Sequence, residues 1–148
     1  LEVWHQTGLA HIDLVRDSYG DLLDGSVRVV SFIEDMAEAY GWADLVLCRA
    51  GALTVSELAI MACPSILVPL PSAIDDHQTA NAHSLTDRGG ARLLVQSEMT
   101  VLSLAAALQN YAGAPKELSD MAAAAAAVAI PDAAARVCDC CEELFHGR

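Results

Sequence analysis

The sequence predicts a doubly wound α/β domain with a mostly parallel sheet, and three observations support this. Strand-like and helix-like segments alternate five times along the chain, and helices then complete it. The candidate strands are short and nearly continuously apolar, as expected when helices cover both faces of a parallel sheet. The chain has 148 residues, 54% of them hydrophobic, which suits one ordinary globular domain.

Local sequence predicts each element of this alternation in turn. The predicted strands are residues 1–4, 27–32, 44–48, 65–70 and 91–95. The predicted helices are residues 11–19, 34–40, 53–62, 76–88, 100–111, 116–127 and 131–145. Gly89 and Gly90 mark the end of the fourth helix, since glycine commonly follows a helix C-terminus. The alanine-rich stretch 121–129 favours a tightly packed helix, because alanine is the best helix former.

The charge balance excludes some classes of function. Eight Lys and Arg residues stand against 20 Asp and Glu residues, a net charge of −12. Because nucleic-acid binding needs a basic patch, we expect no nucleic-acid partner. No apolar run approaches the ~20 residues of a membrane-spanning helix. An anionic ligand would have to be held by helix N-termini and one or two local arginines.

The five cysteines predict neither a disulfide framework nor a metal site. Their number is odd and the chain is large and apolar, so a reducing compartment is expected. Cys138, Cys140 and Cys141 lack the spacing of a zinc site, and His146 stands alone near them. We interpret the three as ordinary helix-face residues and expect no metal and no cofactor.

The segment from Arg49 to Glu57 has the richest chemistry of the strand ends, where doubly wound sheets bind their ligands. Gly51 would allow a tight turn and close approach to a ligand. The following helix offers free N–H groups, and Arg49 adds a donor fork suited to phosphate. Glu57 lies one turn further on, where its carboxylate could accept two hydrogen bonds from a ribose diol. Alternatively, Thr54 and Glu57 form a capping box, which needs no ligand.

Two other strand ends carry candidate ligand contacts. Phe32 and Ile33 could hold a nucleobase on an apolar shelf with exposed backbone amides, or they could simply be core residues. Gln78 and Asn81 share a helix face, and their amides suit sugar hydroxyls, although a solvated face is the alternative. His77 could act as a base, but no nucleophile completes a triad with it. Acidic residues at positions 75 and 76 suit the first turn of a helix.

Together these segments resemble the C-terminal half of the MurG family. MurG enzymes transfer N-acetylglucosamine (GlcNAc) from UDP-GlcNAc to lipid I in bacterial peptidoglycan synthesis. The match runs along almost the whole chain, in order and with family-like spacing. The residues that carry it read WHQTG at 4–8, FIEDMA at 32–37, CRAGALTVSE at 48–57, DHQTANA at 76–82 and IPDA at 130–133.

The resemblance implies a Rossmann-like domain, the donor-binding C-terminal half of a two-domain GT-B glycosyltransferase. Residues 1–148 would form the UDP-GlcNAc-binding domain, without the family's N-terminal acceptor domain and without the first strand of this domain. Ile33 would contact uracil through its backbone, with Phe32 and Met36 nearby, and Glu57 would hold the ribose hydroxyls. The other implied donor contacts are Arg49, Gly51, Ala52, Leu53 and Thr54 around the diphosphate and ribose, and Gln78, His77 and Asn81 on the sugar.

The implied reaction is inverting transfer of GlcNAc to lipid I, giving lipid II. We expect no catalytic residue in this chain, because the resemblance assigns the base, lipid I and the membrane contact to the N-terminal domain. The implied location is the cytoplasmic face of the bacterial plasma membrane. The alternatives are the donor half of another UDP-sugar GT-B protein and a non-catalytic donor-binding subunit of a split transferase.

The missing first strand would lie in the middle of the sheet. Residues 1–4 and 44–48 would then have unpaired backbone edges. We therefore expect a gap between these two strands, direct pairing of the two, or a partner chain in the slot.

Overall fold

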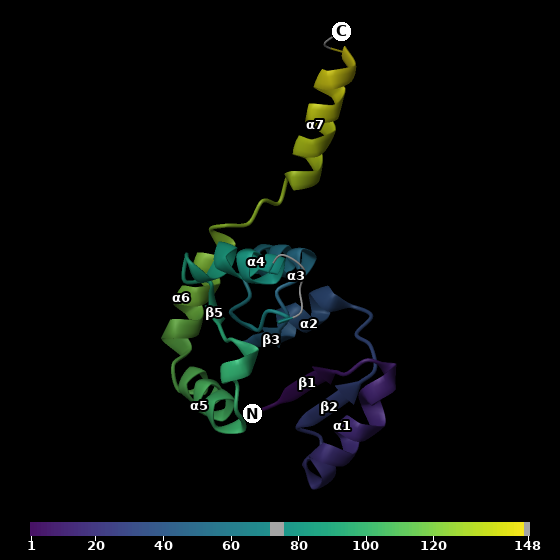
Figure 1. The fold of residues 1–148 in the computed structure, drawn as a ribbon, viewed down its shortest axis with the longest axis vertical. Coiled ribbons are helices and arrows are strands. Elements are labelled where there is room, and N and C mark those ends of the chain that lie inside the picture. The colour runs from purple at the N-terminus through teal and green to yellow at the C-terminus, as the bar shows by residue number, and fades with distance from the viewer. Residues whose placement is uncertain (72–75, 147–148) are drawn as a thin grey trace. The chain divides into compact units, whose positions relative to one another are not determined.

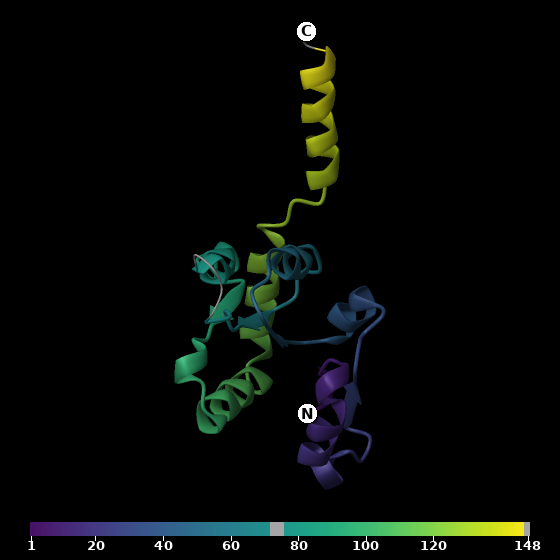
Figure 2. The same cartoon turned by 45° about the vertical axis from the view of Figure 1, so that its right-hand side comes forward.

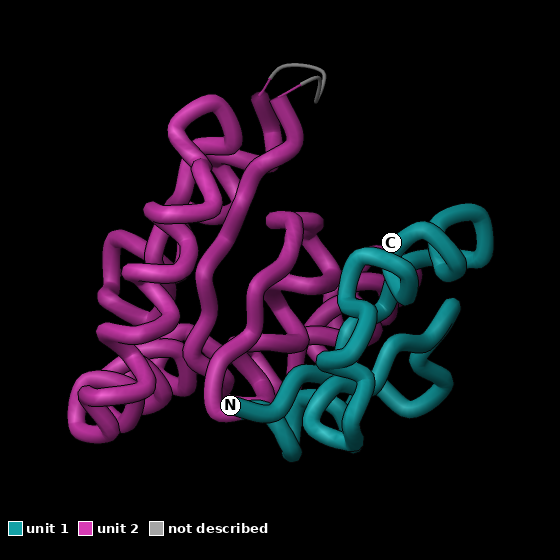
Figure 3. Tube along the Cα trace, turned by 90° about the horizontal axis from the view of Figure 1, so that it is seen from below, with its two compact units in different colours: residues 1–43 teal, residues 44–148 magenta. Residues whose placement is uncertain are grey.

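The computed structural model describes residues 1–71 and 76–146. The chain divides into two compact units, Leu1–Ala43 (unit 1) and Asp44–Arg148 (unit 2), which Figure 3 draws in different colours.

Unit 1 is built on two parallel strands. β1 (Val3–Gln6) pairs with β2 (Val27–Val30), with Val3 opposite Val27. Between them the chain forms the 3₁₀ turns η1 (Leu9–His11) and η2 (Gly20–Leu22) on either side of helix α1 (Ile12–Tyr19). α2 (Met36–Trp42) follows β2, and its N-cap Asp35 accepts the N–H of Glu38 at 2.8 Å. Figure 1 shows α1 alongside β2.

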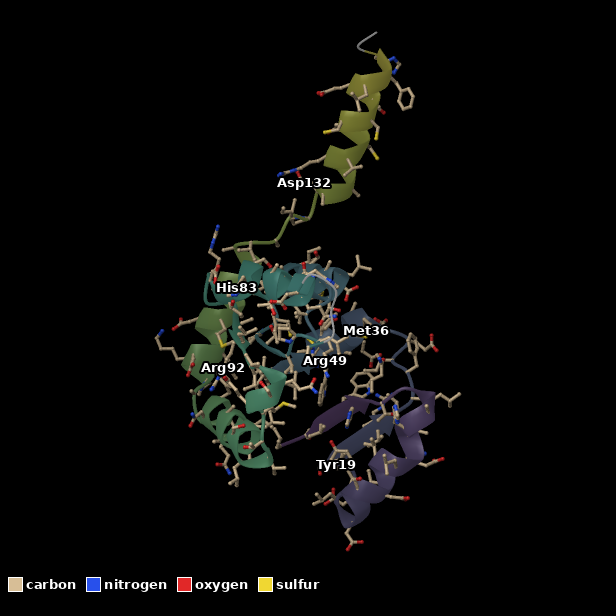
Figure 4. The ribbon with its side chains drawn as sticks, in the orientation of Figure 1. Tyr19, Met36, Arg49, His83, Arg92 and Asp132 are labelled. Carbon is tan, nitrogen blue, oxygen red and sulfur yellow. The ribbon has the colours of Figure 1, made fainter. Side chains whose placement is uncertain are left out.

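Aromatic contacts attach a helix to each face of β1. Successive side chains of a strand point to opposite faces. The Trp4 ring meets the Trp42 ring of α2 edge to face, with ring centroids 5.9 Å apart. The next residue, His5, meets Tyr19 of α1, which Figure 4 labels, at a centroid distance of 5.9 Å. Helices therefore lie on both faces of this strand, as a doubly wound sheet requires.

Unit 2 contains a three-stranded parallel sheet. β4 (Ser65–Leu67) lies between β3 (Val46–Cys48) and β5 (Ala91–Leu93), and all three of its residues are buried. α3 (Ala52–Ile60) connects β3 to β4, and α4 (His77–Thr86) precedes β5. The chain continues through η4 (Gln96–Glu98), α5 (Val101–Ala112), α6 (Pro115–Ala126) and α7 (Ala133–His146).

The core of unit 2 lies between its sheet and helices α5 and α6. Its main cluster is Ile66, Val68, Leu94, Ala107, Tyr111 and Met121. α3 packs against both α4 and α6 (Figures 1 and 2). Gly90, just before β5, touches α6 so closely that an added Cβ would lie 2.8 Å from the Ala125 backbone nitrogen. By contrast, no described residue of α7 is buried.

The structure confirms the α/β class, the parallel pairing and the order of the elements. The strand predicted at residues 1–4 is displaced and runs from Val3 to Gln6. Others are shorter than predicted: the one at 27–32 ends at Val30, and the one at 65–70 ends at Leu67. β1 and β3, the strands expected to flank the missing one, belong to different sheets and are not paired with each other in the described residues. Direct pairing of these two strands, one of the three expected arrangements, is therefore not seen in residues 1–71 and 76–146.

Candidate functional site

α3 presents an exposed face directly after the end of β3. The helix buries Val55, Leu58 and Ala59 on one side. Leu53 is 80% exposed, and Glu57, four residues later, is also exposed. Residues four apart share a helix face, so the Leu53 side chain and the Glu57 carboxylate lie on the same exposed surface. This surface adjoins the helix N-terminus, where the first N–H groups lack intrahelical acceptors.

The structure contradicts the predicted capping box and the need for glycine in the turn at Gly51, whereas close approach of Gly51 to a ligand stays a prediction. Gly51 has φ −65° and ψ 147°, which other residues adopt readily, so the turn does not require glycine. A Cβ there would lie 3.5 Å from the Thr54 hydroxyl oxygen, an ordinary contact. The capping box is absent as well, because Gly51 is the N-cap and no side chain makes a cap hydrogen bond. Thr54 is therefore the third residue of the helix.

Arg49 ties the end of β3 to the end of β4. It lies just after β3 and is labelled in Figure 4. Its Nη1 donates to the carbonyls of Val68 and Pro69, both at 3.2 Å. A guanidinium has five N–H donors, and among the described residues the groups at Nε and Nη2 have no hydrogen-bond partner, so they could serve a ligand. Arg49 can therefore hold the strand ends and an anion at once.

The first two turns of α4 are tied to the same loops through amide side chains. Gln78 Oε1 accepts the N–H of Leu70 at 2.9 Å. Asn81 Nδ2 donates to the carbonyl of Ala50 at 3.1 Å, next to Arg49 and Gly51. The two amides were expected to face a sugar or solvent, and the structure adds a backbone partner for each. These bonds leave Gln78 Nε2 and Asn81 Oδ1 as the polar atoms that can meet a ligand.

The start of α4 has an uncommon backbone conformation. Asp76, its N-cap, has φ 52°, in the left-handed region that non-glycine residues seldom adopt. Its carboxylate accepts the Thr79 hydroxyl at 2.6 Å, which holds the turn. His77, the first helical residue, is exposed. Residue 75 lies outside the described residues.

In unit 1, Phe32, Ile33 and Met36 lie between β2 and the first turn of α2. The Ile33 side chain is 8% exposed, which agrees with a core residue, whereas Phe32 is 63% exposed. Met36, labelled in Figure 4, is half-buried at the start of α2. The Ile33 N–H donates to Gln6 Oε1 at 2.8 Å. The sequence places Gln6 at a strand end where ligands are expected, but it assigns Gln6 no ligand contact.

The structure thus gathers the predicted contacts into two groups, one in each unit. Unit 1 brings together Phe32, Ile33 and Met36. Unit 2 brings together the residues that follow β3 and those that open α4, namely Arg49, Gly51, Ala52, Leu53, Thr54, Glu57, His77, Gln78 and Asn81.

Burial makes the thiols of Cys48 and Cys63 poor nucleophiles. Burial raises the pKa of Cys48 to about 12 and that of Cys63 to about 11, so both thiols are protonated at neutral pH. Cys138, Cys140 and Cys141 on α7 are exposed. Within residues 1–71 and 76–146, no cluster of three or more His, Cys, Asp or Glu side chains is placed to hold a metal ion. No helix in the described part of the chain is long and apolar enough to cross a membrane.

Known proteins resemble this chain over nearly its whole length. A protein of Aeromonas hydrophila named "UDP-N-acetylglucosamine--N-acetylmuramyl-(pentapeptide) pyrophosphoryl-undecaprenol N-acetylglucosamine transferase" is 53% identical over 148 residues, which are 100% of this chain and 41% of that protein. A protein of the same name from Pseudomonas fluorescens is 50% identical over 146 residues, 99% of this chain and 41% of that protein. The chain therefore spans about two fifths of the length of these relatives.

A solved structure and a family profile also match this chain over most of its length. The crystal structure of Acinetobacter baumannii MurG superposes with a TM-score of 0.88 at 41% identity, covering 97% of this chain and 43% of that one. The profile of the glycosyltransferase family 28 C-terminal domain matches residues 1–137, more than nine tenths of the chain. The chain belongs to the glycosyltransferase family 28 C-terminal domain family.

Proposed function

We propose that this chain is the donor-binding part of an inverting glycosyltransferase that moves GlcNAc from UDP-GlcNAc to lipid I, forming lipid II for peptidoglycan. The names of the relatives support this, because they describe an N-acetylglucosamine transferase acting on an N-acetylmuramyl-(pentapeptide) pyrophosphoryl-undecaprenol. The observation that carries the proposal is the exposed start of α3, flanked by Arg49 and followed one turn later by Glu57.

Unit 2 would bind the diphosphate, ribose and sugar. The N–H groups at the start of α3, over Gly51, Ala52, Leu53 and Thr54, suit a diphosphate, because the helix N-terminus carries partial positive charge. Arg49 adds the donors left at Nε and Nη2. Glu57 would accept hydrogen bonds from the ribose hydroxyls. Gln78 and Asn81, with His77 near them, would meet the GlcNAc hydroxyls.

Unit 1 would bind the base. Exposed Phe32 and half-buried Met36 offer apolar surface beside the backbone of Ile33. Uracil has a flat apolar face and a hydrogen-bonding edge, so a short segment with backbone polar groups and exposed aromatic surface suits it.

The chemistry assigned to this chain is electrostatic. As the sugar leaves, negative charge develops on the departing UDP, and the N–H groups at the start of α3 would stabilise that charge. A base that takes the proton of the acceptor hydroxyl would come from another part of the enzyme, as would the lipid I and membrane contacts. We place this reaction at the cytoplasmic face of the bacterial plasma membrane.

The Glu57→Ala substitution tests the proposed function. An unpaired ribose diol should cost ~1–3 kcal/mol, so UDP affinity should fall about 5- to 150-fold. The affinity is measured by ligand-detected NMR titration, with Ser56→Ala, the neighbouring exposed residue, as the control. Equal UDP affinities for wild type, Glu57→Ala and Ser56→Ala would refute the ribose assignment.

A second substitution separates the sugar from the nucleotide. Gln78→Ala should weaken UDP-GlcNAc binding more than UDP binding, since the amide is assigned to the sugar alone. Equal losses for the two ligands would show instead that Gln78 acts only by holding Leu70.

A further inference from the structure

A small pocket lies at the amino ends of the two strands of unit 1. Its volume is about 210 Å³, and its lining includes Glu2, Trp4, Arg28, Glu38 and Trp42. Trp4 is paired with Arg28 in the register of β1 and β2, so both side chains lie on the face of the sheet that meets Trp42 of α2. The proposed base contacts follow the carboxyl end of β2 instead, so this pocket is separate from them.

One wall of the pocket carries a hydrogen-bond donor that lacks an acceptor. The Trp4 indole Nε1 is shielded from solvent and has no hydrogen-bond partner in residues 1–71 and 76–146. Shielded donors are nearly always paired, so this N–H is suited to an acceptor that a ligand brings. The Arg28 guanidinium lies 4.2 Å from the centre of the Trp4 ring, and this exposed side chain would have to move when a ligand reaches Nε1.

The charges around the pocket favour an uncharged ligand. Two exposed carboxylates, Glu2 and Glu38, stand against the guanidinium of Arg28, so an anion such as a phosphate is disfavoured. A ligand cation would have to displace Arg28, which already occupies the position over the Trp4 ring that a cation prefers. Neither carboxylate forms an ion pair within the described residues, so both keep acceptor sites for a neutral ligand.

The aromatic wall and the polar groups together suit a sugar ring. Trp42 is 46% exposed and offers apolar surface to the C–H face of a pyranose. Sugar hydroxyls both donate and accept, so they can donate to the carboxylates and accept from Arg28 and Trp4 Nε1. The pocket is smaller than the ~300–1,000 Å³ of most ligand sites, which limits the occupant to a single ring. We propose that unit 1 binds an uncharged monosaccharide unit in this pocket, independently of the sugar donor.

An NMR titration of the 148-residue chain with glucose tests this proposal. Trp4 and Trp42 are the two tryptophans of the chain and both line the pocket, so their indole N–H signals report directly on it. Glucose should shift both signals. Glucuronate, which has a carboxylate in place of the C6 hydroxymethyl group, should bind about fivefold more weakly, because its charge meets two carboxylates. No indole shift with glucose, or equal binding of the two sugars, would overturn the proposal.

Single substitutions test the assigned carboxylates. Glu2→Ala and Glu38→Ala each remove an acceptor and should weaken glucose binding about fivefold, the size of one hydrogen bond. Glu34→Ala is the matched control, because Glu34 is also exposed in unit 1 but does not line the pocket. Glucose affinities of Glu2→Ala and Glu38→Ala that equal that of Glu34→Ala would overturn the proposal.

A saturating amount of UDP separates this pocket from the proposed donor site. The glucose-dependent indole shifts should be the same with and without UDP, because the two sites use different residues. Loss of these shifts in UDP would mean that glucose acts at the donor site, and the pocket proposal alone would fail. Failure of UDP to bind, with the glucose shifts intact, would refute the proposed donor binding alone.

Discussion

Unit 1 and unit 2 each carry proposed donor contacts, but their hydrophobic cores differ greatly in size. Among the described residues, four buried apolar residues lie in unit 1 and sixteen in unit 2. The sheet of unit 1 has two strands, and such a sheet is marginal without further packing. Unit 2 has a central strand that is buried throughout. The phosphate and sugar contacts thus stand on a packed core, whereas the base contacts depend on aromatic pairs and hydrogen bonds such as Gln6 to Ile33.

The largest effect expected from this comparison is on unit 2. Ile66 is fully buried in β4, so Ile66→Ala should lower the free energy of unfolding by about 2–5 kcal/mol. Urea unfolding followed by circular dichroism measures this, because most of the helical residues lie in unit 2. Trp4 and Trp42, the two tryptophans of the chain, both lie in unit 1, so tryptophan fluorescence follows that unit separately. We expect the fluorescence transition at lower urea and little shifted by the substitution. Fluorescence and circular dichroism transitions that coincide and shift together would show that the units unfold as one, and unit 1 would then not be the less stable unit.

A smaller loss is expected where α6 meets the turn before β5. An added methyl at Gly90 would lie 2.8 Å from the Ala125 backbone nitrogen, and backbone cannot move away as a flexible side chain can. Gly90→Ala should therefore cost about 1–3 kcal/mol in the same urea titration. Gly113→Ala is the control, because a Cβ added there would lie 3.6 Å from its nearest neighbour, the Gln109 carbonyl oxygen, which is an ordinary contact. Equal stabilities of the two variants would show that the backbone at Ala125 shifts at little cost to make room for the added methyl group.

A still smaller effect should appear in unit 1. The Arg28 guanidinium lies 4.2 Å from the centre of the Trp4 ring, and an exposed contact of this kind is worth about 0.5–1 kcal/mol. Arg28→Ala should move the fluorescence transition to lower urea and leave the circular dichroism transition in place. Arg92→Ala, which removes an exposed arginine from β5 in unit 2, should not move the fluorescence transition. A shift of both signals by Arg28→Ala would mean that the units unfold together.

The buried thiols of unit 2 should change the free energy of unfolding only at alkaline pH, so their effect at neutral pH is the smallest. Burial raises the pKa of Cys48 from 9.0 to about 12 and that of Cys63 from 9.0 to about 11. The folded state then keeps both protons while the unfolded chain releases them above pH 9. Their contribution to stability is complete below that pH and is lost as the pH rises toward the folded values. The wild-type free energy of unfolding should therefore fall more steeply between pH 9 and 11 than that of a Cys48→Ala, Cys63→Ala double variant. Parallel pH profiles would contradict the assigned pKa shifts.

The sequence predicted what depends on local pattern. Short apolar runs such as the one around Ile66 identified the strands, and the loops after them identified the candidate contacts. Element ends were less accurate, because the predicted Thr54 cap competes with a helix that begins two residues earlier, at Ala52. Thr-x-x-Glu has the same spacing inside a helix as at its start, so spacing alone could not separate the two.

The contacts that hold the site could not be predicted, because they join segments that lie far apart in the sequence. Gln6 meets Ile33 across 27 positions, and Asn81 meets Ala50 across 31. Arg49 reaches carbonyls 19 and 20 positions away. A polar residue at a strand end gives a signal for binding, but whether it binds a ligand or a neighbouring loop depends on which strands pair.

The most direct test of donor binding is an amide-resolved NMR titration of this 148-residue chain with UDP-GlcNAc and, separately, with UDP-galactose. We expect ligand-dependent shifts of the Ile33 amide and of the amides from Gly51 to Thr54. Saturation should occur at a lower concentration of UDP-GlcNAc than of UDP-galactose, because Gln78 and Asn81 are assigned to the sugar. Shifts confined to other segments, or none at all with either ligand, would contradict the proposal that this chain binds the sugar donor.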